Sequence, residues 1–280
     1  METGTLAEKA ELFRQMHHGP RVLVLANVWD VATARLIETA GFGAVGTSSA
    51  AIAHSMGYPD DQRISRAEML AVVERIANHV ALPVSADLEA GYGESLEAIE
   101  ETTRALIAAG AVGLNLQDGT GDPARPLYDV TAQVEKIRCI RKTADSLGVP
   151  VVINARTDVY LDRVGDPYTH FDQAVKRATV YRKAGADCVF VPAVQSSPTI
   201  RHLVEAIDGP LNILAGPSAP SITELRQLGV ARVSFGSWPM RACMGFFAHF
   251  AREVKESGTF STLLHAEVIP YVEMNKLLTR

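Results

Sequence analysis

Short apolar runs alternate with longer amphipathic segments along this 280-residue chain. The longer segments, such as 95–110 and 170–185, repeat apolar residues at spacings of three and four, which predicts helices. The apolar runs are nearly continuous, as expected of strands buried on both faces of a parallel sheet. The eight candidate strands are VLVLAN (22–27), AVGTSS (44–49), PVSADLE (83–89), VGLNLQ (112–117), PVVINAR (150–156), DCVFVPA (187–193), LNILAG (211–216) and ARVSFG (231–236).

The order of these segments predicts the fold. Before four of the strands a glycine stands where a helix would end in a left-handed cap, in TAGFGAVGTS, AAGAVGLNL, KAGADCVFV and QLGVARVSF. Eight strands separated by helices favour one α/β domain over residues 1–280, a closed (β/α)8 barrel of the TIM type. An open doubly wound sheet is the alternative, but no GxGxxG follows the first strand.

Both ends of the chain add helical segments to this barrel. The N-terminal METGTLAEKAELFRQMHHG has the pattern of an amphipathic helix and lacks the apolar centre of a signal peptide. Residues 257–280 exceed the eight units and are rich in apolar side chains. We expect this C-terminal extension to cover the barrel or to pack on a partner subunit.

Composition excludes several classes of protein. The net charge is −5, 47% of residues are hydrophobic and 21% are charged, which is ordinary for a soluble globular protein. No run of basic residues favours nucleic acid or anionic membranes, and no apolar stretch approaches the roughly 20 residues of a membrane span. The three cysteines are far apart and form no CxxC, which argues against disulfides and zinc. We therefore expect a cytoplasmic protein.

Polar side chains cluster at the ends of the first five strands, where a barrel of this kind carries its active site. Asp87 and Glu89 close the third strand. Oxygen donors without a Cys or His partner suit a hard cation such as Mg²⁺. The simpler interpretation is that the two acids pair with arginines at the rim of the barrel.

Other strand ends offer groups that bind anions. The planar guanidinium of Arg156 can hold two oxygens of a carboxylate or phosphate, and Ser48 and Ser49 could hold another anionic end. Equally, Arg156 could pair with Asp158, the two serines could form only a turn, and Trp29 could belong to the core. Taken together, these residues describe a site for a small anionic substrate bridged by a metal.

Four ordered segments carry a family resemblance: NVWDVATARLIETAGFGAVGTSSAAIAHSMGYPD (27–60), DLEAGYG (87–93), NLQDG (115–119) and NARTD (154–158). They resemble the isocitrate lyase/phosphoenolpyruvate mutase superfamily. The resemblance implies a (β/α)8 barrel that forms dimers paired as tetramers, often with the last helix exchanged between subunits. It also implies Mg²⁺, with Mn²⁺ as a substitute, and 2-oxo acids that react through an enolate.

The resemblance also assigns roles to single residues. It implies that Asp87 is the principal metal ligand and that Glu89 and Gln117 act through water. It makes Asp87, Glu89 and Arg156 the candidate catalytic residues. The positions that it places against substrate are Trp29, Ser48, the backbone of Ser49 and Ala50, Asp60, Asn115 and Arg156.

Two departures from the superfamily pattern shape the predicted function. Gln117 replaces a Glu, which removes one charge from the metal site. Lyases of the superfamily carry K-[KR]-C-G-H after the fourth strand, whereas residues 119–129 read GTGDPARPLYD, without Cys, Lys or His. Cys139 lies in the next helix and is not assumed to replace the missing thiol.

A reaction that needs no positioned thiol is the most compatible with these two departures. The sequence predicts a Mg²⁺-dependent carbon–carbon lyase or decarboxylase for a small 2-oxo acid such as oxaloacetate, with the loop 119–129 as a lid. The alternatives are an isocitrate or 2-methylisocitrate type of lyase, a P–C bond enzyme acting on phosphonopyruvate, and a non-catalytic barrel that binds 2-oxo acids.

Overall fold

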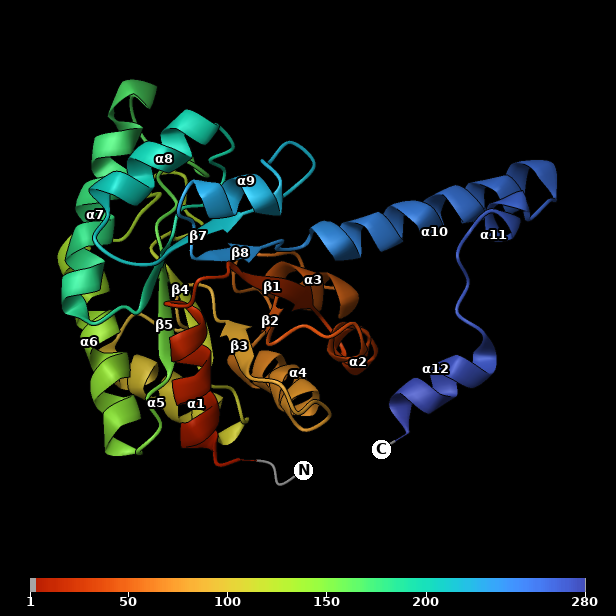
Figure 1. Ribbon diagram of the computed structural model, residues 1–280, viewed down its shortest axis with the longest axis horizontal. Coiled ribbons are helices and arrows are strands. Elements are labelled where there is room, and N and C mark those ends of the chain that lie inside the picture. Colours follow the sequence, from red (N-terminus) through yellow and green to blue (C-terminus); the bar gives the residue numbers. More distant parts are fainter. Residues whose placement is uncertain (1–3, 280) are drawn as a thin grey trace.

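Eight parallel strands close into a barrel in the computed structural model, which describes residues 4–279 (Figure 1). Each strand pairs with the next along the chain, and β8 pairs with β1, so the predicted α/β barrel is confirmed. The strands are β1 (Leu23–Val28), β2 (Val45–Thr47), β3 (Val84–Asp87), β4 (Gly113–Gln117), β5 (Val152–Arg156), β6 (Cys188–Phe190), β7 (Leu211–Leu214) and β8 (Arg232–Ser234).

The helices surround the barrel in the order that the periodicity predicts. Several begin at capping boxes: Thr5 and Glu8 start the first helix, and Ser65 and Glu68 start the fourth. The helices are α1 (Leu6–Met16), α2 (Val31–Thr39), α3 (Ser49–Ser55), α4 (Arg66–Ala77), α5 (Leu96–Ala108), α6 (Val130–Ser146), the 3-10 turn η1 (Pro167–Thr169), α7 (His170–Ala184), α8 (Ser197–Ala206), α9 (Ile222–Gln227), α10 (Trp238–Ser257), α11 (Ser261–Leu264) and α12 (Tyr271–Leu278).

Several strands are shorter than predicted, and two of these differences lie at the site. The second strand ends at Thr47 because Ser48 caps α3, its Oγ accepting a hydrogen bond from the Ala51 N–H at 3.3 Å. The third strand ends at Asp87, and Glu89 has φ +50°, outside the extended region. Asp87 and Glu89 are therefore not two alternating positions on one strand, as the range 83–89 implied.

Helix α1 seals the amino-terminal end of the barrel. Phe13 on this helix is fully buried, and its ring occupies the space beside Gly113, where an added Cβ would lie 2.6 Å from ring atom Cε1. The Arg232 guanidinium lies 5.9 Å from the centre of the same ring. Packing around Phe13 therefore fills this end of the barrel interior.

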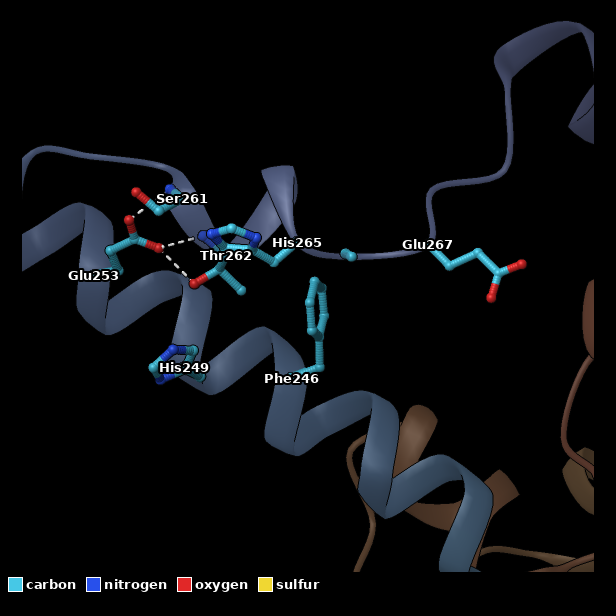
Figure 2. Close-up of a pocket in the computed structure, with 8 residues that line it drawn as sticks. Phe246, His249, Glu253, Ser261, Thr262, His265 and Glu267 are labelled. Atoms are coloured by element: carbon cyan, nitrogen blue, oxygen red, sulfur yellow. Dashed lines mark hydrogen bonds between the residues drawn. The ribbon is translucent and has the colours of Figure 1, made fainter.

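The C-terminal segment projects from the barrel as an arm of three helices (Figure 1). Helix α10 runs outward, and α12 returns to α2, where Arg35 Nε donates a hydrogen bond to the Leu277 carbonyl at 2.9 Å. Figure 2 shows how Glu253 of α10 accepts hydrogen bonds from Ser261 and Thr262 at the start of α11. The predicted extension over 257–280 thus begins inside a longer arm, and its last residue lies outside the described part of the chain.

None of the helices within residues 4–279 combines the length and the apolar character that crossing a bilayer requires.

Candidate active site

A cavity of about 500 Å³ opens at the carboxyl ends of the strands. Its lining comes from the loop after α3 and from the segments that follow β4 and β5. Among the predicted site residues, Asp60, Gln117 and Arg156 line it directly. Asp87 is 9% exposed and lies beside them, close enough to interact electrostatically with Asp60 and Arg156.

Asp87 is held by four groups from neighbouring strands and from α3. Its Oδ2 accepts hydrogen bonds from the Ser49 N–H at 3.1 Å and from Ser49 Oγ at 2.8 Å. Its backbone N–H donates to Thr47 Oγ1 at 2.9 Å, and its Oδ1 receives only a long contact of 3.4 Å from Asn115 Nδ2. Oδ1 therefore keeps lone pairs that a cation can use.

Glu89 is buried in a tight turn after the strand. Its Oε2 accepts a hydrogen bond from the Gln62 N–H at 2.5 Å, and its Oε1 accepts one from the Tyr92 hydroxyl at 3.1 Å. Burial, and then repulsion from Asp87 and Asp60, raises the pKa of Glu89 from 4.5 to about 8. Neither Glu89 nor Asp87 forms an ion pair with a described residue, so the pairing with rim arginines is not present.

This group of acids suits a divalent cation bound partly through water. After burial, repulsion from Asp87 and Asp60 contributes to the raised pKa of Glu89, and Gln117 lines the cavity together with Asp60. Three His, Cys, Asp or Glu side chains do not converge on one point anywhere in residues 4–279, so the protein alone does not enclose an ion. Such a donor set fits Mg²⁺, which retains several waters and takes few carboxylates.

Arg156 is anchored by a chain of buried acids. Its Nε donates to Asp158 Oδ1 at 2.5 Å, and the Asp158 N–H donates to Asp118 Oδ1 at 2.9 Å. Asp118 Oδ2 in turn accepts hydrogen bonds from Arg177 Nη1 at 3.0 Å and from the Tyr181 hydroxyl at 2.7 Å, both on α7. Asp118 therefore points away from Asp87 and does not replace the charge missing at position 117.

The loop 119–129 forms a small ordered hairpin over one side of the cavity. Gly119 pairs with Leu127 in an antiparallel bridge, and Arg125 forms an ion pair with Glu94 at 3.1 Å. An added Cβ on Gly119 would lie 2.4 Å from Asp158 Oδ2, so glycine is required where the loop passes the Arg156 anchor. Cys139 faces a separate hollow between α5 and α6, where its Sγ donates to the Leu96 carbonyl at 3.4 Å.

Comparison with known proteins identifies the family. The sequence pattern described as phosphoenolpyruvate phosphomutase matches residues 13–255. The chain belongs to the phosphoenolpyruvate mutase/isocitrate lyase superfamily. It is similar to a 2-methylisocitrate lyase of Aeropyrum pernix, at 29% identity over 90% of this chain and 82% of that protein. It is also similar to an oxaloacetate decarboxylase of Rhodopseudomonas palustris, at 32% identity over 82% of this chain and 78% of that protein. A crystal structure from Burkholderia cenocepacia, described as a candidate lyase/mutase, has a TM-score of 0.90 and 36% identity, covering 98% and 97% of the two chains.

Among the residues matched to the superfamily pattern, some lie away from the cavity. Ser48 caps α3, as in the simpler interpretation, whereas its neighbour Ser49 contacts Asp87. Trp29 packs against the buried cluster around Ile52 and lines a hollow beside α2 and α4. The predicted contacts of Ser48, Ala50 and Trp29 with substrate remain predictions.

Other residues lie at the site although no sequence pattern predicted it. Gln62 and Tyr92 hold Glu89, and Lys136 Nζ on α6 donates to the Ala90 carbonyl at 3.0 Å. Arg232 on β8 contacts Asn115 from the far side of the barrel. A charged residue inside the apolar strand ARVSFG was the one available hint for Arg232.

Proposed function

We propose that this protein is a Mg²⁺-dependent carbon–carbon lyase or decarboxylase for a small 2-oxo acid, with an oxaloacetate-like substrate favoured. One observation carries the proposal: Arg156, Asp60 and Gln117 line one cavity with Asp87 close beside them, while the loop 119–129 offers no thiol, amine or imidazole. Relatives named as lyases and decarboxylases support the class of reaction.

One group of residues would stabilise charge on the substrate, and another would fix its orientation. Asp87 would hold the metal directly, with Glu89 and Gln117 in its water shell. When bound, Mg²⁺ stabilises the negative charge that develops on the carbonyl oxygen of the substrate. Arg156, fixed by Asp158, would bind the 1-carboxylate and keep the bond that breaks aligned with the carbonyl π system.

Decarboxylation balances without a protein acid. The bond between C3 and C4 of the 2-oxo acid breaks, CO₂ leaves, and the electron pair remains as an enolate of the product. Water then supplies the proton to C3. This sequence requires only positioning and charge stabilisation, which are the two functions that the described site offers.

The charge of the cavity favours a substrate with few carboxylates. Five aspartates line it, namely Asp60, Asp61, Asp122, Asp158 and Asp162, against two arginines, Arg156 and Arg163. Asp158 already offsets part of the charge of Arg156, so the three carboxylates of isocitrate would meet repulsion from the acidic lining. This argues against the isocitrate type of lyase, and phosphonopyruvate stays as a second anion of similar size.

A substrate panel tests the proposal. Protein and Mg²⁺ are incubated with oxaloacetate, isocitrate, 2-methylisocitrate or phosphonopyruvate, and pyruvate, glyoxylate and succinate are measured. We expect pyruvate from oxaloacetate, a loss of at least about 100-fold in Asp87→Ala or with EDTA, and unchanged turnover in Cys139→Ser. Binding without turnover of any substrate would instead support a non-catalytic barrel, and turnover that survives both EDTA and Asp87→Ala would contradict the metal mechanism.

We also propose that the arm of α10 to α12 packs on a second copy of the chain, giving a dimer or a tetramer made of two dimers. The arm exposes large apolar side chains that the barrel does not cover, including Phe247 (60%), Leu264 (74%) and Tyr271 (82%). Light scattering should give a multiple of 30.2 kDa, and removal of the arm should lower it. A monomer at micromolar concentration would contradict this proposal.

A further inference from the structure

Arg232 is a buried cation that the proposed reaction does not use. It is 1% exposed, it forms no ion pair with a described residue, and its Nε and Nη1 have no protein partner within residues 4–279. Its Nη2 makes one hydrogen bond, to Asn115 Oδ1 at 3.2 Å. Since an uncompensated buried charge is costly, this placement calls for a reason beyond packing.

The barrel closure brings this arginine beneath the metal-binding acid. Strands β8 and β4 lie opposite each other in the ring of eight, so the long side chain of Arg232 crosses the interior to reach Asn115. Asn115 is in register with Asp87 on one side and with Asn154 on the other. Burial lowers the pKa of Arg232 to about 10, and the nearby Cys188 and Asp87 act in the opposite direction.

The hydrogen bonds leave the Asn115 amide only one orientation. Its Oδ1 accepts from Arg232 Nη2 and from Asn154 Nδ2, the latter at 2.8 Å. A guanidinium can only donate, so the oxygen must face Arg232 and the NH₂ group must face Asp87. The amide nitrogen then lies 3.4 Å from Asp87 Oδ1 and cannot turn its oxygen toward a cation.

We infer that Arg232 is a positioning residue for the metal site, acting through Asn115 on Asp87. It fixes the amide so that Asn115 orients the carboxylate instead of competing as a ligand, and it places a positive charge under an acid-rich site. The inference rests on the metal site of the proposed function, but on no step of its reaction.

Metal binding itself, without substrate, is the appropriate measurement. Mn²⁺ is titrated into the metal-free full-length chain and free Mn²⁺ is followed by electron paramagnetic resonance. We expect Arg232→Met to weaken binding by about 10-fold or more, as is usual when a partner of a metal ligand is lost, and Arg232→Lys to recover part of the loss. Arg141→Met is the control, because Arg141 is a partly buried arginine that binds two backbone carbonyls and Asp187 and makes no contact with Asp87 or Asn115.

A double-mutant cycle separates positioning from general damage. If Arg232 acts through Asn115, Arg232→Met should weaken Mn²⁺ binding much less in an Asn115→Leu background than in the wild type. If Arg232→Met does not fold, Asn154→Leu removes the other donor to Asn115 Oδ1 and should weaken binding in the same direction.

The possible failures are distinguishable. In one outcome, the wild type binds Mn²⁺, Asp87→Ala abolishes the binding, and Arg232→Met and Asn154→Leu change it by less than about twofold. That outcome would overturn this inference alone. Additive effects in the cycle would also overturn it. An absence of Mn²⁺ binding by the wild type would overturn both the inference and the metal site of the proposed function.

Discussion

Replacing Glu89 with Gln should stabilise the metal-free protein and at the same time impair its activity. Glu89 is 2% exposed, and burial beside Asp87 and Asp60 raises its pKa from 4.5 to about 8. A carboxyl whose folded pKa is raised gives its full stability below the unfolded pKa and loses it as pH rises through the folded pKa. Metal-free wild type should therefore become less stable between about pH 4.5 and pH 8.

The size of the effect follows from the interval between the two pKa values. Each pH unit corresponds to about 1.4 kcal/mol, so the interval from 4.5 to about 8 allows at most about 5 kcal/mol. Gln keeps one side-chain oxygen for the Gln62 N–H, its NH₂ group can donate to the Tyr92 hydroxyl oxygen, and it carries no charge at any pH. Even half of the maximum would raise the Tm of Glu89→Gln by about 5 °C at pH 8.

Thermal unfolding in EDTA between pH 5 and pH 8 is the assay. The Tm of the wild type should fall relative to that of Glu89→Gln as pH rises, and saturating Mg²⁺ should narrow the difference, because a cation relieves the repulsion among the acids. Glu94→Gln, an exposed acid of the same segment, should keep the wild-type pH dependence. If Glu89→Gln is no more stable than the wild type at pH 8 in EDTA, the reasoning about Glu89 is wrong.

Three further variants test other parts of the site. Gln117→Glu adds a carboxylate to the cavity and should tighten Mn²⁺ binding by about 10-fold, measured by titration. Asp118→Asn leaves Arg177 buried without its carboxylate and should cost about 3 to 5 kcal/mol in urea unfolding, whereas a cost below about 1 kcal/mol would show that the pair is dispensable. Lys136→Met removes the donor to the Ala90 carbonyl behind the turn that carries Glu89. It should lower kcat by about 10-fold with little change in KM, and an unchanged kcat would exclude a positioning role for Lys136.

The barrel was predictable from the sequence because its elements differ in period. Continuous apolar runs and helix-period segments located all eight strands and their order. Strand ends were less predictable, since Ser48 and Glu89 leave the extended conformation for reasons that are local to a cap and a turn. For the same reason, the prediction that Asp87 and Glu89 lie on the same face of one strand was wrong.

The contacts around Asp87 were only partly predictable. Ser49 and Asn115 lie at the ends of neighbouring strands, so their approach to Asp87 follows from a parallel sheet. The role of Arg232 does not follow, because its side chain reaches Asn115 only when the barrel closes and sets β8 opposite β4. A sequence pattern gives the face on which a residue lies, but not the residue that it meets across a ring.

The site consists of two parts that the structure supports by different means. The groups around Asp87 come from three strands or their ends, β2, β4 and β8, and are fixed by hydrogen bonds within the barrel interior. The loop 119–129 beside the cavity is a single hairpin, closed by the Gly119–Leu127 bridge and by the Tyr128 N–H, which donates to the Asp118 carbonyl at 2.8 Å. Changes in the loop sequence should therefore leave the groups around Asp87 intact, as expected when a barrel varies its chemistry through its loops. That separation explains how one chain can keep the acids and Arg156 in the barrel while residues 119–129 carry no Cys, Lys or His.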